Sequence, residues 1–381
     1  MLEVCATGQG RCVSSTLRHG WTTGACATAA TKAAYTALLT GDFPDPVPLK
    51  LPKGHQPAFA LTDEELGQGW ARAAVVKDAG DDPDVTHGAV ISATVRAGAP
   101  GTGVIFRAGP GVGTVTKAGL PLEVGEPAIN PRPRQFMRGA IAELATAHGQ
   151  PGDVVVELAV ADGEELARRT WNPRLGILGG LSILGTTGVV VPYSCSAWID
   201  SIRRGIDVAR AAGHRHVAGC TGSTSEQVAA QLYGLPDDAL LDMGDFAGAV
   251  LKYIRRHPLP RLTIAGGIGK LAKLAAGHMD LHSGRAQVDL AYLAELATQS
   301  GGSAELADRL QDEETNTALG ALRLAQQAAV PLGDAVAERS RQVAQGVLRG
   351  SEVTVDVLVI DRAGTIVGRS PDPISGKDTY A

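Results

Sequence analysis

Residues 17–39 combine basic, hydroxyl and small apolar side chains in an order that could bind an anion. Four small side chains recur there at helical spacing: Cys26, Ala30, Ala33 and Ala37. Thr22 or Thr23 is expected to cap a helix over 25–39 by accepting from an N–H group of its first turn. Unpaired N–H groups and the helix dipole favour an anion there, and Arg18 lies just upstream. A capped, buried helix that binds nothing explains the pattern equally well.

Two Gly-rich loops in the C-terminal half could hold a phosphate or a nucleoside. One contains Gly266-Gly-Ile-Gly-Lys, but Ile264 replaces the first glycine of a P-loop and Leu271 replaces its magnesium-binding hydroxyl. This turn could hold an adenosine-type ligand or simply pack closely. The loops at 219–225 and 265–270 both follow predicted strands, where ligands of α/β sheets bind. Their candidate binding residues are Gly219, Thr221, Gly222, Gly266, Gly267, Gly269 and Lys270.

Charged side chains offer two further candidates. Asp81, Asp82 and Asp84 could bind a cation or supply a catalytic carboxylate, although such clusters are more often solvated turns. Arg132 and Arg134 stand between prolines, and the stiffness of this segment suits a clamp for a carboxylate.

The spacing of histidines and cysteines gives little indication of a metal site or a catalytic thiol. His278 and His282 have metal-like spacing but lack a third ligand. The 5 cysteines form no Cys-x-x-Cys pair, so we expect neither a metal site nor a disulfide scaffold. Cys220 stands in a Gly-rich loop, where an exposed catalytic thiolate is a minor alternative.

Composition limits the class of protein. The 381 residues are 44% hydrophobic but only 4% aromatic, which suits two cores built mainly from Ala, Val, Leu and Ile. The net charge is −5, and no basic stretch indicates a nucleic-acid partner. No apolar run reaches the roughly 18 residues of a membrane span, and no signal-peptide pattern opens the chain. We therefore expect a soluble, cytoplasmic protein.

The order of predicted elements indicates two domains. Strands dominate the first half, as at 71–77 and 88–95, so residues 1–190 predict an α+β domain. Strands at 216–219, 239–243 and 261–265 alternate with helices. Residues 191–381 therefore predict a Rossmann-like α/β domain with a mainly parallel sheet.

Taken together, these motifs resemble the CbiD family, the cobalt-precorrin-5B C(1)-methyltransferases of corrin-ring biosynthesis. The similarity runs from about residue 15 to the C-terminus. Gly267 departs from the family pattern, which commonly has a histidine there. The matching segments are Leu17-Arg-x-Gly-x-Thr-Thr-Gly-Ala-Cys-Ala, Asp82-Pro-Asp-Val-Thr, Gly109-Pro-Gly-Val-Gly-Thr-Val-Thr-Lys, Gly125-Glu-Pro-Ala-Ile-Asn-Pro, Asn172-Pro-Arg-Leu-Gly-Ile, Ser182-Ile-Leu-Gly-Thr-Thr-Gly, Ile268-Gly-Lys-Leu-x-Lys-Leu-Ala and His282-Ser.

The resemblance implies methyl transfer from S-adenosylmethionine to C1 of a cobalt-containing tetrapyrrole, giving cobalt-precorrin-6A. The cobalt would belong to the substrate. The first domain would hold the substrate and the second S-adenosylmethionine, on the two Gly-rich loops. Asp84 would tune ring protonation, and His282 would be an axial contact to cobalt. The other candidate substrate-binding residues are Arg18, Thr22, Thr23, Lys117, Asn130, Arg132 and Arg134.

Two other functions remain open at this point. A phosphotransferase would use the Gly-rich loops, and a non-enzymatic carrier would pass tetrapyrrole intermediates between enzymes. The resemblance allows transient contact with neighbouring pathway enzymes and implies no nucleic acid or membrane. The sequence leaves the oligomeric state open.

Overall fold

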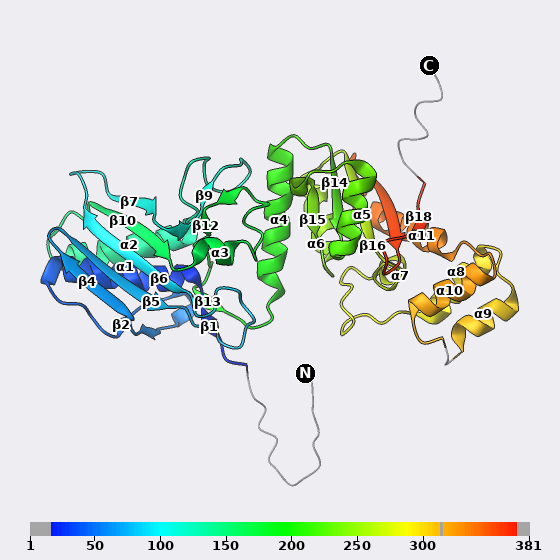
Figure 1. Ribbon diagram of the computed structural model, residues 1–381, viewed down its shortest axis with the longest axis horizontal. Helices are drawn as coiled ribbons and strands as arrows, with labels where there is room; N and C mark the ends of the chain where they lie inside the picture. Colours follow the sequence, from blue (N-terminus) through cyan, green and yellow to red (C-terminus); the bar gives the residue numbers. More distant parts are fainter. Residues whose placement is uncertain (1–16, 313–314, 372–381) are drawn as a thin grey trace, which may run out of the picture. The chain divides into compact units, whose positions relative to one another are not determined.

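The computed structural model describes residues 17–312 and 315–371, and these combine helices with β-sheets in two compact units (Figure 1). Unit 1 holds the described residues up to Thr114, with Pro127–Thr170 and Leu178–Ser194. Unit 2 holds Val115–Glu126, Trp171–Ile177 and the described residues from Cys195 onward. We expected a single domain boundary near residue 190, but two short segments before it group with unit 2.

Unit 1 is built on a five-stranded sheet. Its order is β4 (Asp63–Gly67), β5 (Trp70–Val76), β6 (Val90–Ala97), β10 (Val154–Val160) and β7 (Val104–Ala108). Neighbouring strands are antiparallel except β10 and β7, which are parallel. The strands predicted at 71–77 and 88–95 are confirmed as β5 and β6.

Two helices, α1 (Thr23–Thr40) and α2 (Pro131–Ala147), lie against one face of this sheet (Figure 1). Period-two alternation in β6 turns Ile91, Ala93 and Val95 toward them, all fully buried. The alanines of α1 let its backbone approach the sheet closely. The predicted helix and its buried face of small residues are therefore confirmed.

The remaining short elements lie in unit 1 or where the chain runs from one unit into the other. They are η1 (Pro52–Gly54), α3 (Gly163–Ala167), and the strand pairs β1 (Gly20–Trp21) with β13 (Val189–Val190), β2 (Val47–Pro48) with β3 (Ala58–Phe59), β8 (Gly111–Val112) with β12 (Gly180–Leu181), and β9 (Thr114–Val115) with β11 (Ile177–Leu178).

Unit 2 is built on a second five-stranded sheet. Its order is β15 (Leu240–Asp242), β14 (His216–Cys220), β16 (Arg261–Gly267), β17 (Thr354–Ile360) and β18 (Ile366–Arg369). The first four strands are parallel, and β18 is antiparallel at the edge. The connection from β14 leads to β15 on one side, and the connection from β15 then leads back past β14 to β16 on the other side. This arrangement creates a topological switch point between β14 and β16.

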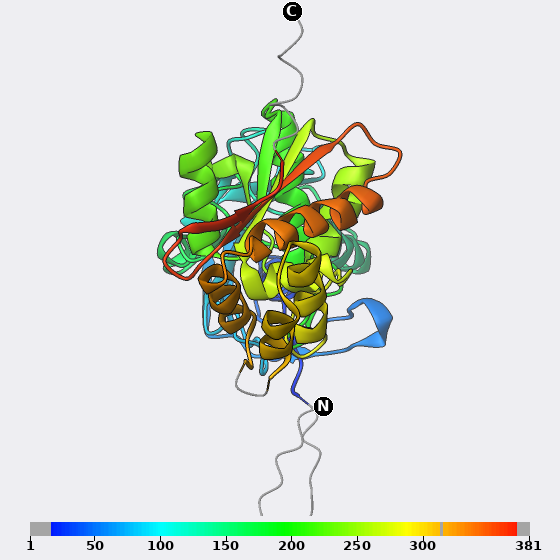
Figure 2. The same cartoon turned by 90° about the vertical axis from the view of Figure 1, so that its right-hand side faces the viewer.

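Helices cover both faces of the second sheet. Side chains alternating along β16 divide between two cores: Leu262 and Ile264 join a large cluster with residues of α4 and α6–α11, whereas Ala265 joins a small one with α5. Figure 2 shows α11 lying against β17 and β18. The helices of unit 2 are α4 (Cys195–Ala211), α5 (Ser223–Tyr233), η2 (Asp237–Ala239), α6 (Ala247–Arg256), α7 (Ile268–Ala275), α8 (Leu290–Gln299), α9 (Ala304–Gln311), α10 (Ala318–Gln327) and α11 (Leu332–Val347).

Within the described ranges, no helix combines the length and apolar character needed to cross a membrane.

Candidate functional site

The polar groups at the start of α1 are hydrogen-bonded to other parts of the protein. Thr22 is the N-cap, and its hydroxyl accepts from the Ala25 N–H at 3.2 Å, which confirms the predicted cap. The Thr23 hydroxyl accepts from the Leu184 N–H at 3.0 Å and lies 3.2 Å from the Leu184 carbonyl. The Gly24 N–H donates to the same carbonyl at 2.9 Å. Thr22 and Thr23 are buried, so both hydroxyls already serve the fold.

The starts of α1 and α2 meet at Leu184. A Cβ on Gly24 would lie 2.7 Å from the Pro133 side chain in the first turn of α2, and 2.9 Å from the Leu184 carbonyl oxygen. Asn130 is the N-cap of α2, and its backbone N–H donates to the Ile183 carbonyl at 2.9 Å. Two positive dipole ends therefore converge on one segment, which favours negative charge nearby.

The two clamp arginines on α2 differ in what they contact. Arg132 is exposed, and its guanidinium donates to the Gln135 side chain at 2.8 Å. Arg134 is partly buried and donates to the carbonyls of Ile129 at 2.7 Å and Pro127 at 3.1 Å. Arg134 thus fastens the loop that precedes its own helix, whereas Arg132 faces solvent.

Arg18 is exposed and forms an ion pair with Asp78. The hydrogen bond and charge of Asp78 raise the pKa of Arg18 further. Its backbone N–H donates to the Asp81 carboxylate at 2.6 Å, while the Asp82 carboxylate accepts from the Tyr193 N–H at 2.7 Å. These two aspartates therefore tie loops together. In the described part of the chain, no group of three or more metal-ligating side chains could hold a metal ion.

Asp84 forms an ion pair with a buried lysine. Its carboxylate accepts from Lys77 Nζ at 2.6 Å and from both the backbone N–H and the hydroxyl of Thr86 at 2.7 Å. The side chain of Lys77 is only 1% exposed. Burial raises the pKa of Asp84, but the charge and hydrogen bond of Lys77 and the bonds from Thr86 outweigh it, so the pKa lies below its usual value. A carboxylate held in this way is a poor proton donor.

Two predicted substrate-binding residues belong to unit 2. Lys117 groups there, not with the unit from which we expected it, and its Nζ pairs with Asp238 at 2.7 Å. Asp238 also contacts His214 Nε2 at 2.7 Å. His282 is exposed, and its Nδ1 accepts from the Gly284 N–H at 3.1 Å. In the neutral ring this assigns the proton to Nε2, which disfavours cobalt ligation through that nitrogen.

The Gly-rich loops of unit 2 lie at the carboxyl ends of adjacent strands. Lys270 Nζ donates to the Thr221 carbonyl at 2.9 Å and pairs with Asp245 at 3.0 Å, which fixes one loop against the other. A Cβ on Gly266 would lie 2.6 Å from Thr221 Oγ1, so glycine is required for this approach. These two loops are brought together as the sequence predicted.

The other candidate glycines divide into open and packed positions. A Cβ on Gly222, Gly267 or Gly269 would have no neighbour within 4 Å, so these backbones are open to a ligand. Gly219 is instead buried within β14, where a Cβ would lie 3.4 Å from Met243 Sδ. Cys220 is also buried, which raises the pKa of its thiol and argues against the minor alternative of an exposed catalytic thiolate.

Several side chains at this edge were not singled out from the sequence. Asp242 ends β15, Glu226 in the first turn of α5 pairs with Arg174, and Trp198 lies on α4. The sequence signals for Asp242 are its place at a strand end and its position 20 residues after Gly222. These signals become informative once the strand order is known.

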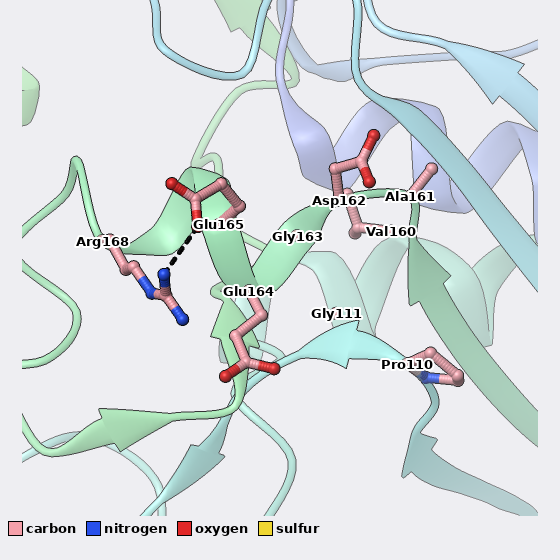
Figure 3. Close-up of a pocket in the computed structure, with 9 residues that line it drawn as sticks. All are labelled: Pro110, Gly111, Val160, Ala161, Asp162, Gly163, Glu164, Glu165 and Arg168. Carbon is pink, nitrogen blue, oxygen red and sulfur yellow. Dashed lines mark hydrogen bonds and ion pairs between the residues drawn. The ribbon is translucent and has the colours of Figure 1, made fainter.

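A pocket of about 430 Å³ opens in unit 1 beside α3 (Figure 3). Its lining includes Asp162, Glu164 and Glu165, with Glu165 paired to Arg168 at 2.8 Å. The excess of carboxylates would repel a polyanionic ligand.

The fold is that of a two-unit protein of mixed helices and sheets, with Gly-rich loops at the carboxyl ends of parallel strands in unit 2. The CbiD family model matches residues 11–192, and the model of the CbiD C-terminal domain matches residues 280–371. The chain belongs to the CbiD family.

Two curated relatives carry the same name. The Cobalt-precorrin-5B C(1)-methyltransferase of Paramagnetospirillum magneticum is 61% identical over 352 residues, covering 92% of this chain and 98% of that protein. The protein of that name from Brucella canis is 59% identical over 353 residues, covering 93% and 95%. A crystal structure titled cobalamin biosynthesis protein (cbiD) from Archaeoglobus fulgidus is 28% identical, with a TM-score of 0.38, covering 71% of this chain and 83% of that one.

Proposed function

We propose that this chain is a cobalt-precorrin-5B C(1)-methyltransferase of cobalamin biosynthesis, which methylates C1 of the ring from S-adenosylmethionine to give cobalt-precorrin-6A. The observation that carries the proposal is 61% identity, across 92% of the chain, to a relative of that name.

We propose that unit 1 binds the tetrapyrrole. The macrocycle has apolar faces and many peripheral carboxylates, so its site needs both exposed apolar surface and local positive charge. Unit 1 exposes Leu184 where two helix dipoles converge, with Arg132 on the first turn of α2. Near the paired strands β1 and β13, Arg18 lies beside exposed Leu17, and Val191 is exposed on the partner segment.

For S-adenosylmethionine we propose a Rossmann-like site on unit 2. The switch point between β14 and β16 is where sheets of this kind bind nucleotides. The open backbone at Gly222, Gly267 and Gly269 leaves room for a ligand there, and Lys270 holds the two loops in one arrangement.

Bound S-adenosylmethionine supplies an electrophilic methyl group on its sulfonium. The ring carbon C1 provides the electron pair for the new C–C bond, and the C–S bond breaks to leave a neutral thioether. No protein nucleophile is needed. The protein contributes by aligning the two reactants and by excluding water. Asp84, held as a carboxylate by Lys77, would act on ring protonation only as a fixed negative charge.

The test is methyl transfer by the purified chain. Incubation with S-adenosylmethionine and cobalt-precorrin-5B should add one methyl group to the ring, detected by mass spectrometry.

In calorimetric titration, Gly269→Asp should lose affinity for S-adenosylhomocysteine, because a carboxylate would enter the open space above α7. Gly269→Ala is the matched control and should bind normally. Undiminished affinity in a folded Gly269→Asp variant would move the cofactor away from these loops.

The structure does not favour a phosphotransferase. Lys270 is already engaged by Asp245 and by the Thr221 carbonyl, and Leu271 is fully buried where a magnesium-binding hydroxyl would be needed. A carrier without catalytic activity would leave the ring unmethylated in the same assay.

A further inference from the structure

One carboxylate at the edge of the second sheet has acceptor capacity that the fold does not use. Asp242 lies opposite Cys220 in the register of β15 and β14, next to the loop that begins at Thr221. Among the described residues, no side chain donates a hydrogen bond to the Asp242 carboxylate, and the nearby Gly244 N–H, which donates to the Cys220 carbonyl at 3.2 Å, helps to lower its pKa. The nearby cations are paired elsewhere, Arg174 with Glu226 and Lys270 with Asp245.

An indole lies beside this carboxylate. Trp198 is 43% exposed, yet its Nε1–H donates to the backbone carbonyl of Asp242 at 3.1 Å. Its ring lies against Gly244, where a Cβ would come within 3.3 Å of Cζ2. The hydrogen bond and this contact hold an exposed aromatic ring in one orientation, and such rigid surfaces suit stacking on a flat ligand.

We propose that Asp242 and Trp198 form the adenosine end of the S-adenosylmethionine site, with the carboxylate accepting the ribose hydroxyls and the indole stacking on adenine. The inference rests on the proposed function and deepens it. Asp242 occupies the carboxyl end of the strand next to the switch-point strand, 20 residues after Gly222. In dinucleotide-binding sheets, an acidic residue about 20 residues beyond the Gly-rich turn binds ribose.

The local charge selects hydroxyl donors over phosphate. Burial and the neighbouring charge of Glu226 raise the pKa of Asp242 above its usual value, while Arg174 and Lys270 act in the opposite direction. A phosphate would add negative charge beside Glu226 and Asp242. Two ribose hydroxyls supply neutral donors instead, which S-adenosylmethionine offers and a free phosphate does not.

The first test compares two ligands on the unaltered full-length protein. S-adenosylhomocysteine should bind at least tenfold more tightly than its 2′-deoxy analogue, because the analogue lacks one donor to Asp242. Equal affinities would overturn the assignment of Asp242. If S-adenosylhomocysteine does not bind and no methyl is transferred, the proposed function itself fails, which is a distinguishable outcome.

The second test uses variants. Asp242→Asn should weaken binding of S-adenosylhomocysteine about tenfold and shrink the preference over the deoxy analogue. Asp200→Asn, on the exposed surface of α4, is the control and should bind normally. Normal affinity and an unchanged preference in folded Asp242→Asn would remove this subsite and leave the methyltransferase proposal intact.

Trp198 has its own readout. S-adenosylhomocysteine should quench tryptophan fluorescence of the unaltered protein, and Trp198→Phe should lose most of that change while binding up to tenfold more weakly. Quenching and affinity that persist unchanged in Trp198→Phe would exclude the indole from the site, whether or not the Asp242 variant folds.

Discussion

The ion pair between Lys77 and Asp84 is the clearest case in which one residue changes its expected role. The Lys77 ammonium is buried, and within residues 17–312 and 315–371 its only ion-pair partner is Asp84 at 2.6 Å. Removing the carboxylate would leave a positive charge buried in unit 1 without compensation. We therefore assign Asp84 to the stability of this unit.

Asp84→Asn should destabilise the protein by about 3 kcal/mol at neutral pH, the usual cost of breaking a buried pair from one side. The folded pKa of Asp84 is lowered, so its stabilisation is complete above the unfolded value of about 3.9 and is lost as pH falls through the folded pKa. The difference in urea unfolding free energy between variant and parent should therefore shrink at acidic pH. A difference that stays constant from pH 7 to pH 3 would show that the pair is not its source.

At the scale of elements, helix α1 depends on small side chains. Ala30 and Ala33 are fully buried against the sheet and α2, so the helix has no room for a larger residue. The same close packing brings Gly24 against Pro133 and sets the start of α1 beside that of α2. The geometry of the proposed substrate surface therefore follows from the packing of the helix.

Ala30→Leu should destabilise unit 1 by about 1–3 kcal/mol through overpacking, and should lower methyl transfer by displacing the helix start. Thr40→Leu, at the exposed end of the same helix, is the control and should stay within about 0.5 kcal/mol. Thermal unfolding and turnover measure the two effects. Parental stability and activity in Ala30→Leu would contradict the packing argument.

At the scale of the whole molecule, the two ligands are proposed to bind different units. Each unit has its own core and its own sheet, and each of the two proposed binding surfaces uses residues of one unit. Ligand binding should therefore protect the amide hydrogens of one unit selectively.

In hydrogen exchange, S-adenosylhomocysteine should slow exchange at 220–226 and 266–270, and at 100 times its Kd it should stabilise the protein by about 2.7 kcal/mol. Methionine, which lacks the adenosine, is the matched control and should give little protection. Protection confined to residues 17–40 and 127–147 would assign the cofactor to unit 1.

The sequence by itself determined the features that depend on local pattern. Small residues at helical spacing after Thr22 gave a capped, buried helix, and alternating β-branched residues gave β5 and β6. The motifs also identified the family, because their joint order is specific even where each piece is weak.

Only the tertiary structure decided which groups are already used. Thr23, Asp84 and Lys117 had suitable chemistry in the sequence, but their partners lie 161, 7 and 121 residues away, and the two distant partners are set by packing. The strand order likewise brought Asp242 beside the loop after β14, and only that neighbourhood makes its acidic type and its spacing from Gly222 informative. Side-chain types and local periodicity are written in the sequence, whereas long-range pairing depends on how the whole chain packs.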